Sequence, residues 1–327
     1  MKAIRIHETG DPNVLTYEDV PDPQPKPGEV LIKVEAVSMN YADVGRRSGR
    51  YGGGAAPNFP IALGLDGAGT ITAVADDVTD RTVGQRVAFF GPSYAEYTTI
   101  AAGSTAKIPD GVAIEAAACV PVVFGTAWYC FKDVTELKST EDVLVQAGGS
   151  GVGTAAIQIA KYIAKDGGKI ITTAGSDEKV QKALDLGADV AINYNIQNFV
   201  DEVKKATDGK GVDVVLESVG GEVYKQSLEA MASGGRLVSI GRTGGEVPKI
   251  DEGFLSQKGI SAVQFGFGTL RNERMAEVVG TIEMLMMLIR VGIFKVIIDR
   301  TFPLSQAQDA HSYLEGRKAF GKVVLIP

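Results

Sequence analysis

Residues 143–161 read Val143-Leu-Val-Gln-Ala-Gly-Gly-Ser-Gly-Val-Gly-Thr-Ala-Ala-Ile-Gln-Ile-Ala-Lys161. The pattern predicts an apolar strand that ends in a glycine turn, with a helix opening at about Gly151. Gly148 allows a tight turn, Gly151 allows the backbone to approach a pyrophosphate, and Gly153 allows the helix to pack close to the strand. Strand, turn and helix in this order predict a dinucleotide site at the helix N-terminus. The alternative is a glycine-rich turn that holds no ligand.

The composition is that of a globular protein large enough for two domains. The chain has 327 residues, 45% of them hydrophobic and 22% charged, with a net charge of −7. This acidic balance argues against a nucleic-acid partner. The apolar segment 278–298 is interrupted by Glu283, Arg290 and Lys295, and no signal peptide is visible, so we expect no membrane association. Two cysteines make no disulfide framework, and a cytoplasmic location is expected.

The pattern of residue types along the sequence changes at about residue 113. Before it, short β-type runs separated by proline and glycine predict a small, partly open barrel. After it, helices, including one over 124–134, alternate with apolar strands and predict a doubly wound parallel sheet. The run 260–267 is expected to add a last strand to this sheet. The tail is expected to hold a long helix, a strand at 294–298, a short helix at 305–314 and a strand at 322–326.

The end of the second predicted strand of this sheet indicates which dinucleotide binds. In an NAD-preferring site an acidic residue about 20 residues past the glycines accepts the ribose 2′-OH. Here Ala174 and Gly175 stand where that carboxylate is expected. Ser176 as a donor and Lys179 as a counter-charge favour NADPH. The alternative is that Asp177 or Glu178 serves the ribose and Lys179 is a solvated helix residue.

Further motifs occur in order along the chain, and the main ones are Val37-Ser-Met-Asn-Tyr-Ala-Asp43, Arg47-Ser-Gly49, Gly64-Leu-Asp-Gly-Ala-Gly69, Tyr94-Ala-Glu-Tyr97, Gly125-Thr-Ala127, Glu217-Ser-Val-Gly220, Ser239-Ile-Gly241 and Gly321-Lys-Val-Val-Leu325. Together with the glycine run they resemble the medium-chain dehydrogenase/reductase superfamily, most closely its zinc-free quinone oxidoreductase (zeta-crystallin-like) branch. The resemblance spans essentially the whole chain. The chain departs from the family pattern at Ser150, the middle glycine position, and at Gly45, where many relatives carry a tyrosine.

The resemblance implies an α/β protein with a GroES-like β-barrel catalytic domain (residues 1–122 and 267–327) and a Rossmann NADPH-binding domain (residues 123–266). It places NADPH in the cleft between them and implies a homodimer. The implied cofactor-binding residues are Asn40, Thr126, Ile240, Gly241 and Arg242 at the nicotinamide end, Gly151, Val152 and Gly153 at the pyrophosphate, Ser176, Lys179 and Tyr194 at the 2′-phosphate, Ser218 along the cofactor, and also Gly175 and Phe265. Thr126 as a helix N-cap and Tyr194 as an ordinary strand residue remain alternatives.

The residue types favour chemistry without a metal. Zinc alcohol dehydrogenases of the superfamily need a thiolate and an imidazole as ligands. Asn40 stands in place of the first cysteine, Leu65 replaces the histidine, and Cys119 alone makes no zinc site. A quinone accepts hydride at an electron-poor ring and takes its proton from water, so the enzyme contributes mainly positioning. We therefore predict an NADPH-dependent quinone reductase.

Two other functions remain open. Reduction of an activated C=C bond in an alkenal, enone or enoyl thioester needs a proton donor, and Tyr51 is the best-placed phenol unless it is only a loop aromatic. With Asn40 and Tyr51, Asp43 and Arg47 complete the candidate catalytic set, although these two are equally explained as a structural pair that holds the loop. The second alternative is a non-enzymatic NADPH-binding protein, like crystallin or RNA-binding relatives.

Overall fold

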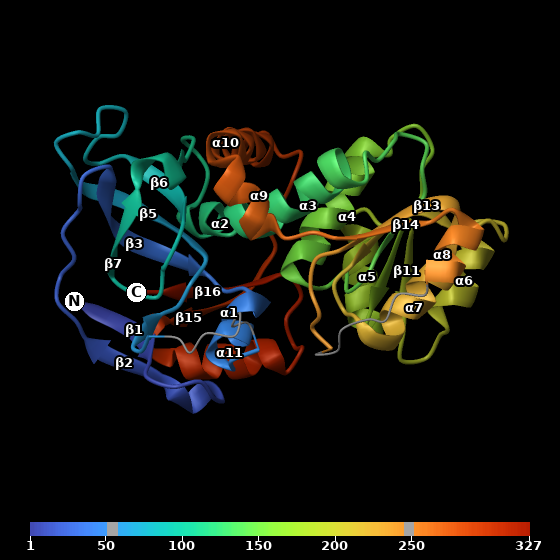
Figure 1. Cartoon of the computed structure of the whole chain (residues 1–327), viewed down its shortest axis with the longest axis horizontal. Helices are drawn as coiled ribbons and strands as arrows, with labels where there is room; N and C mark the ends of the chain where they lie inside the picture. The colour runs from blue at the N-terminus through green and yellow to red at the C-terminus, as the bar shows by residue number, and fades with distance from the viewer. Residues whose placement is uncertain (51–57, 245–251) are drawn as a thin grey trace. The chain divides into compact units, whose positions relative to one another are not determined.

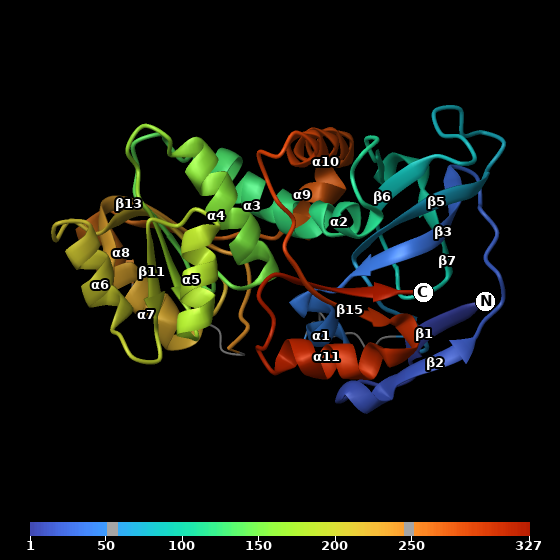
Figure 2. The same ribbon diagram turned by 180° about the vertical axis from the view of Figure 1, so that it is seen from behind.

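The structure is a computed structural model that describes residues 1–50, 58–244 and 252–327. The chain divides into two compact units, one of Met1–Gly125 with Arg271–Pro327 and one of Thr126–Leu270. Figures 1 and 2 show the two units from opposite sides. The predicted division into a catalytic domain (1–122 and 267–327) and a cofactor domain (123–266) stays a prediction. Tyr51 lies outside the described residues.

The first unit is built mainly from antiparallel strands in two sheets. The smaller has the order β2-β1-β4, and the larger has the order β15-β16-β3-β5-β6-β8 with β7 also paired to β3. The two ends of the larger order do not pair among the described strands, so this unit is an open structure. The strands are β1 (Lys2–Ile6), β2 (Leu15–Asp19), β3 (Glu29–Ser38), β4 (Ile61–Ala62), β5 (Asp66–Val74), β6 (Arg86–Phe90), β7 (Tyr97–Ala101), β8 (Thr105–Lys107), β15 (Ile298–Pro303) and β16 (Lys322–Ile326).

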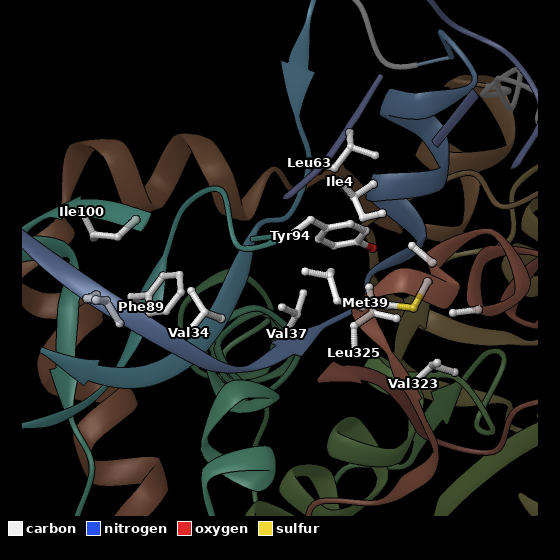
Figure 3. Close-up of a cluster of buried hydrophobic side chains, with 14 of the residues drawn as sticks. Ile4, Val34, Val37, Met39, Leu63, Phe89, Tyr94, Ile100, Val323 and Leu325 are labelled. Carbon is white, nitrogen blue, oxygen red and sulfur yellow. The ribbon is translucent and has the colours of Figure 1, made fainter. Parts of the chain in front are cut away.

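The core of this unit follows from the alternation of its strands. In β3, Ile32 and Val34 are buried while Lys33 between them is exposed, because successive side chains point to opposite faces. These side chains pack with residues from β1, β6, β16 and the turn at Tyr94 (Figure 3). The unit also contains α1 (Tyr41–Arg47), α2 (Ile114–Ala118), the π-helical η3 (Val120–Phe124), α10 (Met275–Arg290), α11 (Ala307–Glu315) and the short 3-10 turns η1 (Pro12–Val14), η2 (Ala102–Ser104) and η5 (Leu304–Gln306).

The second unit is a doubly wound parallel sheet, as predicted. Its order is β11-β10-β9-β12-β13-β14 and every pairing is parallel, which is the Rossmann order. The strands are β9 (Val143–Val145), β10 (Ile170–Ala174), β11 (Val190–Asn193), β12 (Val212–Glu217), β13 (Met231–Ser239) and β14 (Ser261–Gln264). Apart from β14 they are largely buried, because helices cover both faces of the sheet.

The helices of this unit lie on opposite sides of the sheet (Figures 1 and 2). α4 (Gly151–Ile163) and α5 (Asp177–Asp185) lie on one side, and α6 (Phe199–Ala206), α7 (Gly221–Glu229) and α8 (Glu252–Lys258) lie on the other. The second group shares a buried apolar cluster with Leu144, Val215 and Leu237 of the strands. The remaining helical segments are α3 (Gly125–Tyr129), the π-helical η4 (Cys130–Val134) and α9 (Phe267–Glu273).

Some predicted elements differ from the observed ones. The strand predicted at 294–298 is wrong: β15 begins at Ile298, because pairing with β16 starts only at Ile298 opposite Lys322. The single helix predicted over 124–134 is α3 followed by η4, and η3 precedes it. The last strand predicted at 260–267 ends at Gln264, and Phe267 opens α9. None of the described helices is long and apolar enough to cross a membrane.

Candidate functional site

The glycine turn connects β9 to α4 at the carboxyl end of the parallel sheet. A side chain is excluded at Gly148, where a Cβ would lie 2.1 Å from Thr172 Oγ1, and at Gly153, where it would lie 2.3 Å from the carbonyl oxygen of Ala147. The left-handed residue of the turn is Ala147, with φ 54°, and not Gly148. Gly148 and Gly153 are therefore required for close packing of helix and strands.

Ser150, the departure from the glycine pattern, fits the turn. Its backbone is extended (φ −76°, ψ 165°), so the position does not require glycine. It is the N-cap of α4, and its Oγ accepts a hydrogen bond of 3.0 Å from Gly153 N. The first N–H groups of a helix have no intrahelical acceptor and attract anions, so the turn that carries Gly151, Val152 and Gly153 suits a pyrophosphate.

The residues predicted to surround a 2′-phosphate come together at the ends of β10 and β11. A Cβ on Gly175 would lie 2.6 Å from the Tyr194 hydroxyl, so the two residues touch only because Gly175 has no side chain. Ser176 is the N-cap of α5 and accepts from the N–H of Lys179 at 3.3 Å. Tyr194 is 45% exposed and follows β11, so its ring is accessible to a ligand.

The predicted residues at the other half of the sheet are also neighbours. Ile240 N donates to the carbonyl oxygen of Glu217 at 2.9 Å, and Thr243 N donates to that of Ser218 at 3.2 Å. Phe265 N donates to the carbonyl oxygen of Ser239 at 2.8 Å, while Arg242 Nη2 donates to Gln264 at 3.2 Å. Ser218, Phe265 and the segment from Ile240 through Gly241 to Arg242 therefore form one edge at the carboxyl ends of β12, β13 and β14.

Glu217 belongs to one of the family motifs, and no role was predicted for it. Its buried carboxylate accepts from Val219 N at 2.6 Å, Gly220 N at 2.8 Å and Ser239 Oγ at 3.4 Å. Burial raises the pKa of Glu217 above its ordinary value, and the hydrogen bonds oppose that rise. This carboxylate sets the shape of the loop that carries Ser218. The available sequence signal was a carboxylate directly after the buried apolar run Val214–Leu216.

Thr126 lies inside a continuous helical run. Gly125 before it has helical backbone angles (φ −57°, ψ −50°), so Thr126 is not an N-cap and that alternative is excluded. Its side chain is 7% exposed.

In the first unit, Asn40 belongs to a buried polar network. Its Nδ2 donates to Asp66 Oδ1 at 2.7 Å and to the Ser38 carbonyl at 3.2 Å, and its Oδ1 accepts from Lys322 Nζ at 2.8 Å. Lys322 also donates to the Met39 carbonyl, and Asp66 accepts from Val122 N at 2.9 Å. All hydrogen-bonding groups of the Asn40 amide are thus engaged, with the ammonium of Lys322 as the neighbouring cation.

Asp43 is fully buried beside this network. Its carboxylate accepts from Asn40 N at 2.9 Å and from Gly64 N at 3.2 Å. Burial raises the pKa of Asp43 to about 7; the Asn40 hydrogen bond opposes the rise and the charge of Asp66 adds to it. Burial likewise raises the pKa of Asp66. Both hydrogen bonds of Asp43 fix the entry to α1.

The expected pairing of Asp43 with Arg47 is wrong, because among the described residues the ion pair of Arg47 is with Glu315. Arg47 is 1% exposed, and its guanidinium makes a two-pronged contact with Glu315 at 2.9 and 3.0 Å. It also lies 3.2 Å from His311 Nδ1, whose other nitrogen is 3.1 Å from the Tyr94 hydroxyl. Burial, reinforced by Arg47, lowers the pKa of His311 to about 3. Arg47 therefore ties α1 to α11.

The described part of the chain contains no cluster of three or more His, Cys, Asp or Glu residues that could hold a metal ion. Cys119 and Cys130 are both buried and free. Burial raises the pKa of Cys119 to about 12, and it also raises that of Cys130. Both thiols are therefore packing residues at neutral pH.

A GroES-like unit and a Rossmann unit with a glycine turn at its switch point define the class of nucleotide-dependent oxidoreductases. Residues 26–110 match the alcohol dehydrogenase GroES-like domain family, and residues 151–283 match the zinc-binding dehydrogenase family. Among curated proteins, the quinone oxidoreductase of Pseudomonas aeruginosa is 36% identical over 332 residues, with 100% of this chain and 99% of the relative covered. The chain belongs to the quinone oxidoreductase family of the medium-chain dehydrogenase/reductase superfamily.

Two further similarities bear on function. The crystal structure of Escherichia coli quinone oxidoreductase complexed with NADPH superposes with a TM-score of 0.92 at 32% identity, covering 100% of both chains. The 2-haloacrylate reductase of a Burkholderia species is 28% identical over 334 residues, covering 99% of this chain and 98% of the relative.

Proposed function

We propose that this protein is an NADPH-dependent quinone reductase that works without a metal. The observation that carries the proposal is the cradle formed by Gly175, Ser176 and Tyr194 after β10 and β11, in a chain that is similar along its whole length to quinone oxidoreductases. Gly175 stands where an NAD-preferring site carries a carboxylate, Ser176 and Tyr194 offer hydroxyls beside it, and Lys179 follows in the first turn of α5. This donor set suits a 2′-phosphate.

The residues of the second unit would hold the cofactor. The turn of Gly151 to Gly153 would bind the pyrophosphate, and Ser176, Lys179 and Tyr194 would bind the 2′-phosphate. Glu217 keeps Ser218 and the segment 240–242 in register along the edge of the sheet. NADPH, when bound, supplies the hydride for the quinone. The quinone oxygen takes its proton from water, so the protein contributes mainly positioning.

Steady-state rates with an acceptor panel test this function. We expect NADPH oxidation with 9,10-phenanthrenequinone to exceed that with 2-alkenals, and a chelator to leave the rate unchanged. Faster turnover of 2-alkenals would favour reduction of activated C=C bonds, the activity class suggested by the similarity to the 2-haloacrylate reductase. In that case Tyr51→Phe should abolish alkenal turnover, because Tyr51 would donate the proton. Tight NADPH binding without turnover of any acceptor would favour a non-enzymatic binding protein.

A homodimer formed through the Rossmann sheet belongs to the same proposal, as does a cytoplasmic location without nucleic-acid partners. The support for the dimer is that β14 is the edge of its sheet and that Ser261, Val263 and Gln264 are exposed. An exposed strand edge offers unpaired backbone groups to a second copy. Light scattering tests the dimer, and a monomer mass would refute it.

A further inference from the structure

Two asparagines fasten the segment after β11 to the turn after β10. Asn193 Nδ2 donates to Asp177 Oδ1 at 2.6 Å, and Asn195 Nδ2 donates to the Gly175 carbonyl at 2.7 Å. Tyr194 stands between them, with its hydroxyl against Gly175. The cradle for the 2′-phosphate is therefore held together by side-chain bonds between two loops that are adjacent in space and distant in sequence.

Asp177, the residue directly after Ser176, carries a carboxylate that could oppose the binding of NADPH. It is the first residue of α5, directly after Ser176 and two residues before Lys179, and it is exposed. The positive end of the helix dipole stabilises a carboxylate there. An acidic side chain at this place accepts a ribose 2′-OH or repels a 2′-phosphate. A site that takes NADPH must therefore keep the charge of Asp177 away from the phosphate.

Asn193 holds the Asp177 carboxylate through its side-chain amide. It is 7% exposed, and its amide is oriented by a second contact, because its Oδ1 accepts from Asn195 N at 3.2 Å. The backbone N–H of Asn193 donates to Gln197 Oε1 at 3.1 Å, which fixes the backbone that carries this side chain. The next carboxylate, Glu178, is engaged at 2.7 Å by Lys182, one turn further along α5. Both acidic residues of the first turn are thus bound by neighbouring side chains.

We propose that Asn193 is a specificity residue that binds the Asp177 carboxylate and so allows this site to take NADPH. The inference rests on the proposed function, because it assumes that the cradle binds the adenosine 2′-phosphate. In this proposal Asp177 is held by Asn193, in place of the sequence-based alternative in which Asp177 binds a ribose hydroxyl. The residues that contact the phosphate would be Ser176, Lys179 and Tyr194, while Asn193 acts through Asp177.

Equilibrium titration of NADPH and NADH, followed by nucleotide fluorescence without an electron acceptor, tests the proposal. Asn193→Ala should lower the ratio of NADPH to NADH affinity about fivefold, as expected for one carboxylate released near a phosphate in water. The loss should shrink at high salt, because salt screens exposed charges. Asp177→Ala in the Asn193→Ala background should restore the ratio. Asn195→Ala is the matched control, since it removes a bond between the same loops without releasing Asp177, and it should leave the ratio unchanged.

Two outcomes would overturn the inference: an unchanged ratio in Asn193→Ala, or a lowered ratio that Asp177→Ala does not restore. The second would mean that Asn193 acts by placing Tyr194. If Asn193→Ala does not fold, Asp177→Glu serves instead. It moves the carboxylate one methylene beyond Asn193 at an exposed helix position and should also lower the ratio, so an unchanged ratio would count against the inference. A wild-type protein that prefers NADH would refute the proposed cofactor itself, which is a separate failure.

Discussion

The missing side chain at Gly175 makes room for the Tyr194 hydroxyl. Gly175→Ala would place a methyl group 2.6 Å from that oxygen. The Tyr194 hydroxyl is the far end of a half-exposed side chain, so the ring can rotate away from the added methyl group. We therefore expect the free energy of unfolding to change by less than about 1 kcal/mol. NADPH affinity should fall, because Tyr194 would leave the 2′-phosphate, while NADH affinity should change little. Fluorescence titration of both nucleotides, with thermal unfolding alongside, measures the two effects.

Tyr194→Ala is the matched control for that substitution. If Gly175→Ala acts by displacing Tyr194, it should add nothing further to the loss of NADPH affinity in the Tyr194→Ala background. An equally large further loss of NADPH affinity would show that the added methyl group disturbs the ligand directly. The explanation of Gly175→Ala through displacement of Tyr194 would then be wrong.

Asp43 should make stability depend on pH. Its pKa is about 7 in the folded protein and near 3.8 in the unfolded chain, so between these values the folded state keeps a proton that the unfolded state releases. The stability that Asp43 contributes is therefore complete below about pH 4 and is lost as the pH rises towards 7. Asp43→Asn removes this titration. The difference in unfolding free energy, wild type minus variant, should fall with pH by at most about 1.4 kcal/mol per pH unit.

Urea unfolding of both proteins at several pH values between 4 and 7 measures that difference. The other titrating groups are common to both proteins and largely cancel. A difference that does not change with pH would mean that Asp43 is ionised in the folded protein at acidic pH, contrary to the effect of its burial.

At the level of elements, the N-terminus of α4 depends on Ser150. Its Oγ bond to Gly153 N is lost in Ser150→Ala, and we expect the free energy of unfolding to fall by about 1 kcal/mol, the usual cost of losing an N-cap. Ser150→Gly should cost only a few tenths of that amount, because glycine is tolerated at an N-cap. Chemical denaturation measures both variants. Equal losses in the two would contradict the capping role.

The local patterns explain which elements could be predicted. The apolar strand Val143–Val145, the glycine turn and α4 follow one another directly along the chain, so a local sequence pattern predicts them, and this prediction is confirmed. The family resemblance, rather than a local pattern, indicated that Tyr194 joins Ser176 at one site. The structure brings Gly175 and Tyr194 into contact because neighbouring parallel strands end at one edge of the sheet, and their contact with a 2′-phosphate stays a prediction. The predicted strand at 294–298 failed because an apolar run does not specify where its partner begins, and β16 pairs only from Lys322.

Long-range partners could not be predicted from one sequence. Arg47 pairs with Glu315, which is 268 positions away, and nothing near Arg47 distinguishes this partner from the closer Asp43. The bond from Asn193 to Asp177 likewise depends on how two loops meet in space. Lys322 was part of a family motif, yet its place beside Asn40 and Asp66 required the packing of β16 against β3. Burial decides the pairs of Arg47 and Lys322, because a buried charge must find a partner.

At the scale of the whole molecule, each unit has its own apolar core. One is formed around β1, β3, β6 and β16, and the other around β9, β12 and β13. The residues proposed for the pyrophosphate and the 2′-phosphate all belong to the unit Thr126–Leu270. A ligand that binds only the folded state stabilises the unit that holds it, by about 2.7 kcal/mol at a concentration of one hundred times Kd. We therefore expect NADPH to stabilise the second unit most.

Hydrogen exchange in the presence and absence of NADPH measures this difference for separate strands. The slowest amides of β12 and β13 should exchange about a hundredfold more slowly with NADPH at one hundred times Kd, because their exchange requires unfolding of the second unit. The slowest amides of β3 and β16 should change less, provided that the two units unfold independently. Equal protection in both cores would mean that the units unfold as one cooperative body. Stronger protection in β3 and β16 than in β12 and β13 would contradict the assignment of the phosphate-binding residues to the second unit.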